Sequence, residues 1–203
     1  MKTLVLDAMG VIYTAGDDVA ELLCPFIHEN GGISDDRRIE AIYHEASLGR
    51  ISAIQFWEEV QLDPGLEDAY LLRHRLSPGL LQFLRNARPR LASIWCLSND
   101  VSEWSRKLRD HFGLHRLIDG FVISGDVGAR KPEAAIFKHL LAQTGVKAEG
   151  LVFVDDRPRN LDTAAALGFQ TILFGSAGRE PCQHYATTDF THLLDYVCSS
   201  DRV

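Results

Sequence analysis

The chain has 203 residues, of which 46% are hydrophobic and 24% are charged, and its formal net charge is −7. This composition is typical of a soluble globular protein with one sizeable core and a smaller appended unit. Because nucleic-acid and membrane-surface binders usually present a basic face, the acidic balance argues against both. We therefore expect neither nucleic acid nor membrane as a partner, whereas a small anionic substrate is compatible with a locally positive pocket.

The cysteines are scattered and form no CxxC pair; they are Cys24, Cys96, Cys182 and Cys198. This spacing favours neither a zinc site nor a disulfide framework. The N-terminal residues resemble a strand rather than a secretory signal, and no apolar run is long enough to span a bilayer. We expect a reduced, cytoplasmic setting, and the sequence specifies no oligomeric state.

The first predicted element is a short apolar strand that ends in a carboxylate. Leu4, Val5 and Leu6 are apolar at consecutive positions, which is typical of a strand buried on both faces of a parallel sheet. Asp7 would then stand at the carboxyl end of this strand, where open α/β sheets bind their ligands. An aspartate that merely caps a turn is the alternative interpretation.

Residues 15–76 show helical patterns without buried strands. Apolar residues recur at helical spacing over 18–28, where Pro25 can kink or shorten the helix. Three further helices are predicted: one opened by Ser34, one capped by Ser52, and one after the turn at 63–65. We predict a small helical cap over 15–76, inserted into an α/β core made of 1–14 and 77–203.

From residue 77 onward helices and strands alternate. The predicted strands cover 94–97, 121–123, 151–154 and 170–174, and the predicted helices cover 80–87, 101–112, 133–144, 159–167 and 189–198. Pro132 is expected in the first turn of the third of these helices. The alternation predicts the α/β fold class, with a Rossmann-like, doubly wound parallel sheet.

Polar residues follow the predicted strands or open a helix on the same edge of the sheet. They are Asp7, Ser98-Asn99, Lys131 and Asp155-Asp156. Each has an ordinary explanation by itself, because serine and asparagine cap helices, most lysines lie at the surface, and paired acids form turns. Their joint placement at one sheet edge instead predicts a ligand site.

The order of these motifs resembles the haloacid dehalogenase superfamily, whose members are mostly phosphatases. The family's D-x-D-G-[TV], strand-Ser/Thr, lysine and paired-acid motifs are matched in turn by Asp7-Ala8-Met9-Gly10-Val11, Cys96-Leu97-Ser98-Asn99, Lys131-Pro132-Glu133-Ala134-Ala135-Ile136-Phe137 and Phe153-Val154-Asp155-Asp156-Arg157. The residues of these motifs are most similar to those of glucose-1-phosphatase-like members and of the N-terminal domains of soluble epoxide hydrolases. The insert at 15–76 lies where this family places its small helical cap.

The resemblance implies a magnesium-dependent phosphatase that acts on a small phosphorylated metabolite. It implies that Asp7 is the nucleophile and forms an aspartyl-phosphate. It places magnesium on Asp7, the backbone carbonyl of Met9 and Asp156, with Asp155 acting on a bound water. It also implies that Ser98, the backbone near Asn99, and Lys131 hold the phosphoryl oxygens.

One position departs from the family pattern. The second acid of the first motif usually serves as general acid and base, and here that position is Met9, whose thioether carries no proton. General acid–base catalysis is worth on the order of 100- to 10,000-fold. We therefore expect a preference for leaving groups that depart as anions, such as aryl, acyl or anomeric phosphates, unless a polar cap residue or a water substitutes.

Two other functions stay open. A metal-independent 2-haloacid dehalogenase also lacks the second acid, but its fourth motif avoids paired acids. A non-catalytic pseudo-phosphatase that binds phosphate or a partner is supported by Met9 alone. Substrate choice is expected to lie in the cap, where Arg50 contacts an anionic or sugar group and Trp57 stacks on a ring; surface and core roles are the alternatives for these two residues.

Overall fold

The computed structural model describes residues 1–175 and 183–198, so Cys182 lies outside the described residues. A sheet with the order β3-β2-β1-β4-β5-β6 forms its centre, and every neighbouring pair is parallel. The strands are β1 (Thr3–Leu6), β2 (Ser93–Ser98), β3 (Gly120–Ile123), β4 (Leu151–Asp155), β5 (Gln170–Phe174) and β6 (Tyr185–Thr187). The chain runs outward from β1 to β3 and then outward from β4 to β6. This is the predicted doubly wound α/β fold.

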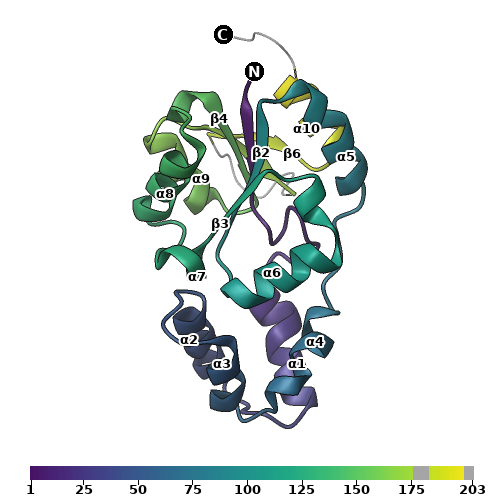
Figure 1. The fold of residues 1–203 in the computed structure, drawn as a ribbon, viewed down its shortest axis with the longest axis vertical. Helices are drawn as coiled ribbons and strands as arrows, with labels where there is room; N and C mark the ends of the chain where they lie inside the picture. Colours follow the sequence, from purple (N-terminus) through teal and green to yellow (C-terminus); the bar gives the residue numbers. More distant parts are fainter. Residues whose placement is uncertain (176–182, 199–203) are drawn as a thin grey trace.

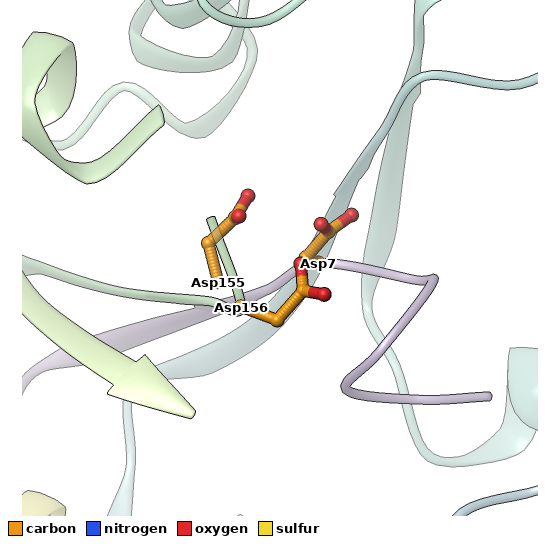
Figure 2. Close-up of side chains that lie close together, drawn as sticks. All are labelled: Asp7, Asp155 and Asp156. Carbon is orange, nitrogen blue, oxygen red and sulfur yellow. The ribbon is translucent and has the colours of Figure 1, made fainter. Parts of the chain in front are cut away.

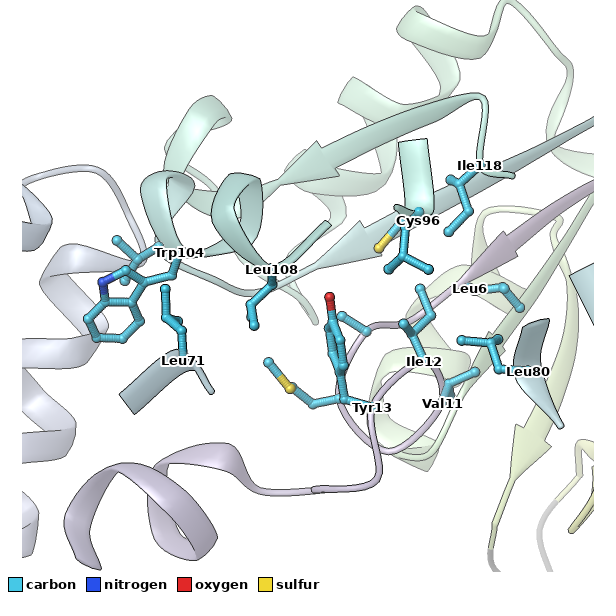
Figure 3. Packing of buried hydrophobic residues seen from close by; sticks show 14 of the residues in the cluster. Leu6, Val11, Ile12, Tyr13, Leu71, Leu80, Cys96, Trp104, Leu108 and Ile118 are labelled. Atoms are coloured by element: carbon cyan, nitrogen blue, oxygen red, sulfur yellow. The ribbon is translucent and has the colours of Figure 1, made fainter. Parts of the chain in front are cut away.

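Helices cover both faces of the sheet (Figure 1). One face packs against α5 (Leu80–Ala87), α6 (Ser102–His111) and α10 (Phe190–Cys198), and the other against α8 (Ala134–Thr144) and α9 (Pro158–Ala166). Leu4 and Leu6 enter the first core, part of which Figure 3 shows, whereas Val5 enters the second. Alternate side chains of β1 thus serve two cores, which explains why the strand is apolar at consecutive positions.

The segment between β1 and α5 forms a helical insert that lies below the sheet in Figure 1. It contains a π-helix (Val19–Leu23), α1 (Cys24–Glu29), α2 (Asp36–Ala46), α3 (Ala53–Glu59), a 3₁₀ turn (Pro64–Leu66) and α4 (Glu67–Leu71). Ser52 caps α3 as predicted, in a capping box with Gln55. Asp35 rather than Ser34 caps α2, because its carboxylate accepts the first free amides of that helix.

The core of the insert is aromatic, and Trp57 lies at its centre. Trp57 is fully buried, packs against Phe26, Phe56, Tyr70 and Trp104, and donates its indole N–H to Glu67 at 3.1 Å. No face of the ring is left for a substrate. The stacking role considered for Trp57 is therefore wrong, and its core role is confirmed.

The insert packs against the carboxyl edge of the sheet. The Tyr43 hydroxyl donates to the backbone carbonyl of Asn99 at 3.2 Å, and the Ser124 hydroxyl donates to that of Ser47 at 2.5 Å. A Cβ atom on Gly49 would lie 2.3 Å from the carbonyl oxygen of Gly125, so only glycine permits this approach. The ends of the strands thus face the insert rather than open solvent.

Two elements differ from the prediction. Helix α8 begins at Ala134, after the cis peptide between Lys131 and Pro132, so Pro132 is not in its first turn. The reason is that the backbone of Lys131 bonds to the side chain of Asn99 and not to a helix. Strand β6 was not predicted because three residues are too few to show a period.

The remaining short elements are α7 (Ser124–Val127) and 3₁₀ turns at Arg88–Arg90, Leu114–Arg116 and Ala148–Gly150. No helix in the described parts of the chain combines the length and apolar character needed to cross a membrane.

Candidate active site

A cavity of about 250 Å³ lies between the carboxyl edge of the sheet and the helical insert. The core contributes Asp7, Met9, Ser98, Asn99, Arg130, Lys131, Arg157 and Asn160 to its lining. The insert contributes Asp17, Asp18, Val19, Ala20, Cys24, Asp36, Glu40, Tyr43 and His44. The structure therefore brings together five residues that the sequence selected from three separate motifs: Asp7, Met9, Ser98, Asn99 and Lys131.

Asp7 has one engaged oxygen and one available oxygen. Its Oδ1 accepts a hydrogen bond from the amide of Ala8 at 2.6 Å and lies 2.6 Å from Nζ of Lys131. Its Oδ2 accepts no hydrogen bond from any residue that the structure describes. Burial, reinforced by Asp155, raises the pKa of the Asp7 carboxyl well above its usual value, while Lys131 acts in the opposite direction. Oδ2 is the oxygen free to react or to bind a cation.

Asp155 is fully buried, and both of its oxygens are engaged. Lys131 Nζ lies 2.9 Å from Oδ2, the Arg157 amide donates to Oδ1 at 2.8 Å, and the Asn160 amide group lies 3.0 Å from both oxygens. A buried carboxylate needs such partners to offset its desolvation. Asp155 therefore holds Lys131 beside Asp7 and fixes the end of β4.

Asp156 differs from Asp155, because its Oδ1 is buried and has no hydrogen-bond partner in the described part of the chain. The side chain occupies the space beside Gly10, where a Cβ atom would lie 2.4 Å from Asp156 Oδ2, and Gly10 itself has a φ of +75°. Burial, followed by the charge of Asp155, raises the pKa of Asp156 to about 6. An unpartnered buried carboxylate oxygen points to a cationic ligand.

The three carboxylates of Asp7, Asp155 and Asp156 gather at the ends of β1 and β4, as Figure 2 shows. One oxygen from each lies within 4.8 Å of the others. The Lys131 ammonium contacts the carboxylates of Asp7 and Asp155. One positive charge does not balance three carboxylates, so the cluster keeps an excess of negative charge. Oxygen donors with unbalanced negative charge fit a hard divalent cation such as magnesium.

The other side of the cavity carries hydrogen-bond donors. Ser98 is 1% exposed at the end of β2, and its Oγ has no hydrogen-bond partner among the residues that the structure describes. The side chain of Asn99 is occupied, because its Oδ1 accepts from the amide of Lys131 at 2.8 Å and its Nδ2 donates to the Lys131 carbonyl at 2.9 Å. Ser98 and Lys131 can therefore bind an anion directly, whereas the Asn99 side chain positions Lys131.

The structure does not bring Arg50 to this cavity. Its guanidinium lies 2.8 Å from the Glu45 carboxylate, its side chain is 60% exposed, and it is not part of the cavity lining. The insert instead reaches the cavity through the segment around Asp18 and through one side of α2. Contact between Arg50 and a substrate therefore has no support from this arrangement.

The sequence reasoning missed several residues of the cavity wall, above all Asp18, Tyr43 and Arg130. Arg130 directly precedes Lys131, and its guanidinium carbon lies 5.6 Å from the centre of the Tyr43 ring. Its Nη1 is buried and has no hydrogen-bond partner within residues 1–175 and 183–198. Asp18 belongs to an acidic pair that opens the first helix of the insert. A pair of acids at a helix start normally indicates capping, which is why the pair gave no functional signal.

The model of the haloacid dehalogenase-like hydrolase family matches residues 1–168, which is most of the chain. The chain therefore belongs to the haloacid dehalogenase-like hydrolases. This family is the class of enzyme that the fold and the sheet-edge acids define.

Among curated relatives, the phosphoserine phosphatase of Thermus thermophilus is 30% identical over 117 residues, which cover 58% of this chain and 47% of the relative. The chain also spans only part of other curated relatives, 11% of the drimenol cyclase drtB of Aspergillus calidoustus and 56% of the sesquiterpene phosphatase astK of Aspergillus oryzae.

Two solved structures share the fold over nearly the whole chain. The magnesium complex of the HAD family enzyme bt-2542 from Bacteroides thetaiotaomicron superposes with a TM-score of 0.76 and 20% identity, covering 95% of this chain and 98% of that one. The HAD phosphatase from Thermococcus onnurineus has a TM-score of 0.75 and 20% identity, covering 100% of both chains.

Proposed function

We propose that this hydrolase is a magnesium-dependent phosphatase that acts on a small phosphorylated metabolite through an aspartyl-phosphate on Asp7. The observation that carries the proposal is that one cavity holds two groups with free atoms: the Asp7 carboxylate, whose contacts with Ala8 and Lys131 are made by Oδ1, and the buried Ser98 hydroxyl, which has no hydrogen-bond partner among the described residues. Nucleophilic attack on phosphorus needs the first, and binding of the phosphoryl oxygens needs the second. The Lys131 ammonium beside Asp7 offsets the charge of the transferred group.

The residues fit magnesium on the evidence of their own contacts. Asp7, Asp156 and the backbone carbonyl of Met9 would hold the ion, and Asp155, whose oxygens are already engaged, would act through a bound water. When bound, magnesium supplies positive charge that lets carboxylates approach a phosphoryl group. Asp7 attacks, Ser98 and Lys131 bind the phosphoryl oxygens, and Asn99 holds Lys131 in place.

The helical insert would act as a cap over this site, in a protein of the reduced cytoplasm. The contacts of Tyr43 with Asn99 and of Ser124 with Ser47 support a closed arrangement of insert and core. Closure excludes water from the reacting groups and strengthens their electrostatic interactions. The substrate would accordingly be small enough for the cavity between the two.

The dehalogenase alternative is disfavoured by Asp156. In a metal-free reaction at carbon, the half-buried Asp156 carboxylate beside Asp7 would repel both the nucleophile and an anionic substrate. A phosphatase uses the same group as a metal ligand. The paired acids therefore support phosphoryl transfer.

The test is phosphate release from a panel of aryl, acyl and sugar phosphates, with magnesium and with chelator. We expect release that requires magnesium and is lost in Asp7→Asn. The Ser98→Ala variant, whose loss of a hydroxyl keeps the volume nearly unchanged, is expected to raise KM or lower kcat without abolishing magnesium binding. Chloride release from a 2-chloro acid in the presence of chelator would instead establish the dehalogenase. Binding of phosphate and magnesium without turnover on any substrate would establish the pseudo-phosphatase.

A further inference from the structure

The missing second acid leaves the proposed phosphatase without an evident proton donor. Met9 is 7% exposed and packs in the hydrophobic core. An alkyl alcohol is a poor leaving group unless its oxygen receives a proton as the phosphorus–oxygen bond breaks. A buried acid in the cavity wall that has no structural task could supply this proton.

Asp18 meets this description. It is 6% exposed and lines the same cavity as Asp7, and no other residue in the described part of the chain donates a hydrogen bond to its side chain. It stands at the N-terminal boundary of the first helix of the insert, yet it makes no capping bond. A carboxylate that is buried without such a role requires another explanation.

The capping task belongs to the neighbours of Asp18. The Asp17 carboxylate accepts the amide of Ala20 at 3.1 Å, and the Glu21 carboxylate accepts the amides of Gly16 and Asp17 at 3.0 and 2.8 Å. The first bond satisfies a free amide in the first turn of the helix, and the other two close the turn that precedes it. The Asp17 side chain is 57% exposed, whereas Asp18 is turned inward. The two acids therefore have different roles.

The segment before Asp18 folds over the end of β1 and so places Asp18 beside the site. The Gly10 amide donates to the Ala15 carbonyl at 2.7 Å, which folds the segment back over the end of β1. A Cβ atom on Gly16 would lie 3.2 Å from Asp156 Oδ2, and Arg157 Nη2 donates to the Gly16 carbonyl at 2.9 Å. Asp18 follows two residues later, on the insert side of the cavity.

The other acids and bases of this region are committed or exposed. The Asp100 carboxylate accepts the Val101 amide at 2.7 Å and does not line the cavity. The Tyr43 hydroxyl donates to a backbone carbonyl, and the His44 side chain is 52% exposed beside Glu45. Asp18 combines burial, a free carboxyl group and a place in the cavity wall.

Several titratable and charged groups lie within electrostatic range of Asp18. They are the acids Asp17 and Asp100, the arginines Arg130 and Arg157, and the phenols of Tyr43 and Tyr70. Burial, followed by the charge of Asp17, raises the pKa of Asp18 to about 6, against the opposing effect of the two arginines. Such an acid can both give and take a proton near neutral pH.

We propose that Asp18 is the general acid and base of this enzyme, in place of the acid absent at Met9, and that alkyl phosphates are therefore among its substrates. This inference rests on the proposed phosphatase function. Asp7 attacks phosphorus, the bond from phosphorus to the leaving oxygen breaks, and that oxygen takes the proton of the Asp18 carboxyl group to leave as an alcohol. Water then attacks the phosphorus of the aspartyl-phosphate and gives a proton to the Asp18 carboxylate. The Asp7–phosphorus bond breaks, and inorganic phosphate leaves.

The experiment compares kcat/KM for propyl phosphate and for 4-nitrophenyl phosphate in the wild type and in Asp18→Asn. The value of kcat/KM covers the steps up to release of the alcohol. Nitrophenolate, unlike an alkyl alcohol, leaves without taking a proton. We expect Asp18→Asn to lower kcat/KM for propyl phosphate by on the order of 100- to 10,000-fold, and that for 4-nitrophenyl phosphate by less than about 10-fold. In the wild type, kcat/KM for propyl phosphate should fall as the pH rises, because the Asp18 carboxyl group loses its proton. This fall should disappear in Asp18→Asn. An equal loss on both substrates would show a binding or structural role and overturn the proposal.

A second variant tests the chemical role directly. Met9→Asp in the Asp18→Asn background restores an acid at the usual family position, and it should recover at least 10-fold of the lost kcat/KM for propyl phosphate. A double variant no better than Asp18→Asn, in protein that melts like the wild type, would contradict the proposal. Asp110→Asn, which removes an exposed acid outside the cavity lining, should leave both substrates unaffected and controls for net charge.

The wild type separates failure of this inference from failure of the proposed function. Magnesium-dependent hydrolysis of 4-nitrophenyl phosphate without any hydrolysis of propyl phosphate would overturn the role of Asp18 and keep the phosphatase. No hydrolysis of either substrate would overturn both.

Discussion

Asn99 holds the backbone of Lys131 by two hydrogen bonds, accepting from its amide at 2.8 Å and donating to its carbonyl at 2.9 Å. The two residues are separated by 32 positions and follow different strands. This pairing fixes the backbone from which the Lys131 ammonium reaches both Asp7 and Asp155. The Asn99 side chain thus acts on the site through Lys131.

Asn99→Ala is expected to remove both bonds and to lower the free energy of unfolding by about 1–3 kcal/mol, because each bond contributes about 0.5–1.5 kcal/mol. Loss of the Lys131 position should also lower kcat/KM by at least 10-fold, measured by phosphate release. Urea unfolding gives the stability change. Asn99→Asp keeps the acceptor for the Lys131 amide and loses the donor, so it should fall between the wild type and Asn99→Ala. Equal activity of all three proteins would refute the positioning role.

Gly10→Ala should abolish activity, since the added methyl group would lie 2.4 Å from Asp156 Oδ2 and force this carboxylate out of place. Gly31 provides the matched control, because its φ of +80° is similar to the +75° of Gly10. Apart from its chain neighbours, no described residue has an atom within 4 Å of the position that a Cβ atom on Gly31 would take. Both substitutions strain the backbone by roughly 1–2 kcal/mol. Thermal melting should therefore show a loss in both variants, and magnesium titration should show lost binding in Gly10→Ala only.

Glu67 is expected to be a principal stabilising contact between the insert and the core. Its Oε2 accepts the indole N–H groups of Trp57 at 3.1 Å and Trp104 at 2.8 Å, and its Oε1 lies 2.8 Å from Lys107 Nζ. Glu67→Ala leaves two buried donors without an acceptor and should lower the free energy of unfolding by about 2–4 kcal/mol.

Lys107→Ala removes two partly exposed ion pairs, with Glu67 and Asp68, and should lower the free energy of unfolding by at most about 1 kcal/mol. Chemical unfolding followed by tryptophan fluorescence measures both variants. Similar losses in the two would show that the indole bonds contribute little.

The buried carboxyl group of Asp18 should make stability depend on pH. Its pKa is raised from 3.8 to about 6 in the folded protein, so the folded state binds the proton more tightly than the unfolded chain. The contribution to stability is fully present below about pH 4 and is lost as pH rises through 6. Between these limits the wild type should lose up to about 3 kcal/mol relative to Asp18→Asn, at 1.36 kcal/mol for each pKa unit.

Melting curves of the two proteins from pH 4 to pH 8 check this expectation. Asp18→Asn should melt at or above the wild-type temperature at pH 8, because it removes a buried charge whose burial outweighs its attraction to Arg130 and Arg157. The exposed Asp110 provides a control, and Asp110→Asn should follow the wild type at every pH. A wild type that gained stability over Asp18→Asn as pH rises would have the opposite sign and refute the burial argument.

Local pattern was sufficient for the core elements and for the central acids. Helix α5 and strand β5 have the predicted bounds, and the capping of α3 by Ser52 was readable because a cap depends on residues three positions apart. The proximity of Asp7 and Ser98 was predictable because the carboxyl ends of parallel strands meet at one edge, and Lys131 was placed at the same edge by the helix expected to follow it. These inferences need only spacing along the chain and the general rule of parallel sheets.

Tertiary structure alone decided the different roles of the two acids in each adjacent pair. Asp155 and Asp156 are adjacent and chemically identical, yet Lys131, Asn160 and the Arg157 amide engage the first and leave an oxygen of the second free. Asp17 and Asp18 differ in the same way, one capping a helix and the other buried in the cavity wall. Arg50 and Trp57 had plausible spacing but lie on the surface and in the aromatic core.

The sequence by itself determined the α/β class, the edge of the sheet that carries the acids, and the absence of a proton-carrying group at Met9. Only the tertiary structure decided which carboxylates are engaged, where Arg50 lies, and that Asp18 enters the cavity. The physical reason is range: helix caps and strand periods depend on neighbours along the chain, whereas burial and the hydrogen bonds of a carboxylate depend on groups brought together from distant segments.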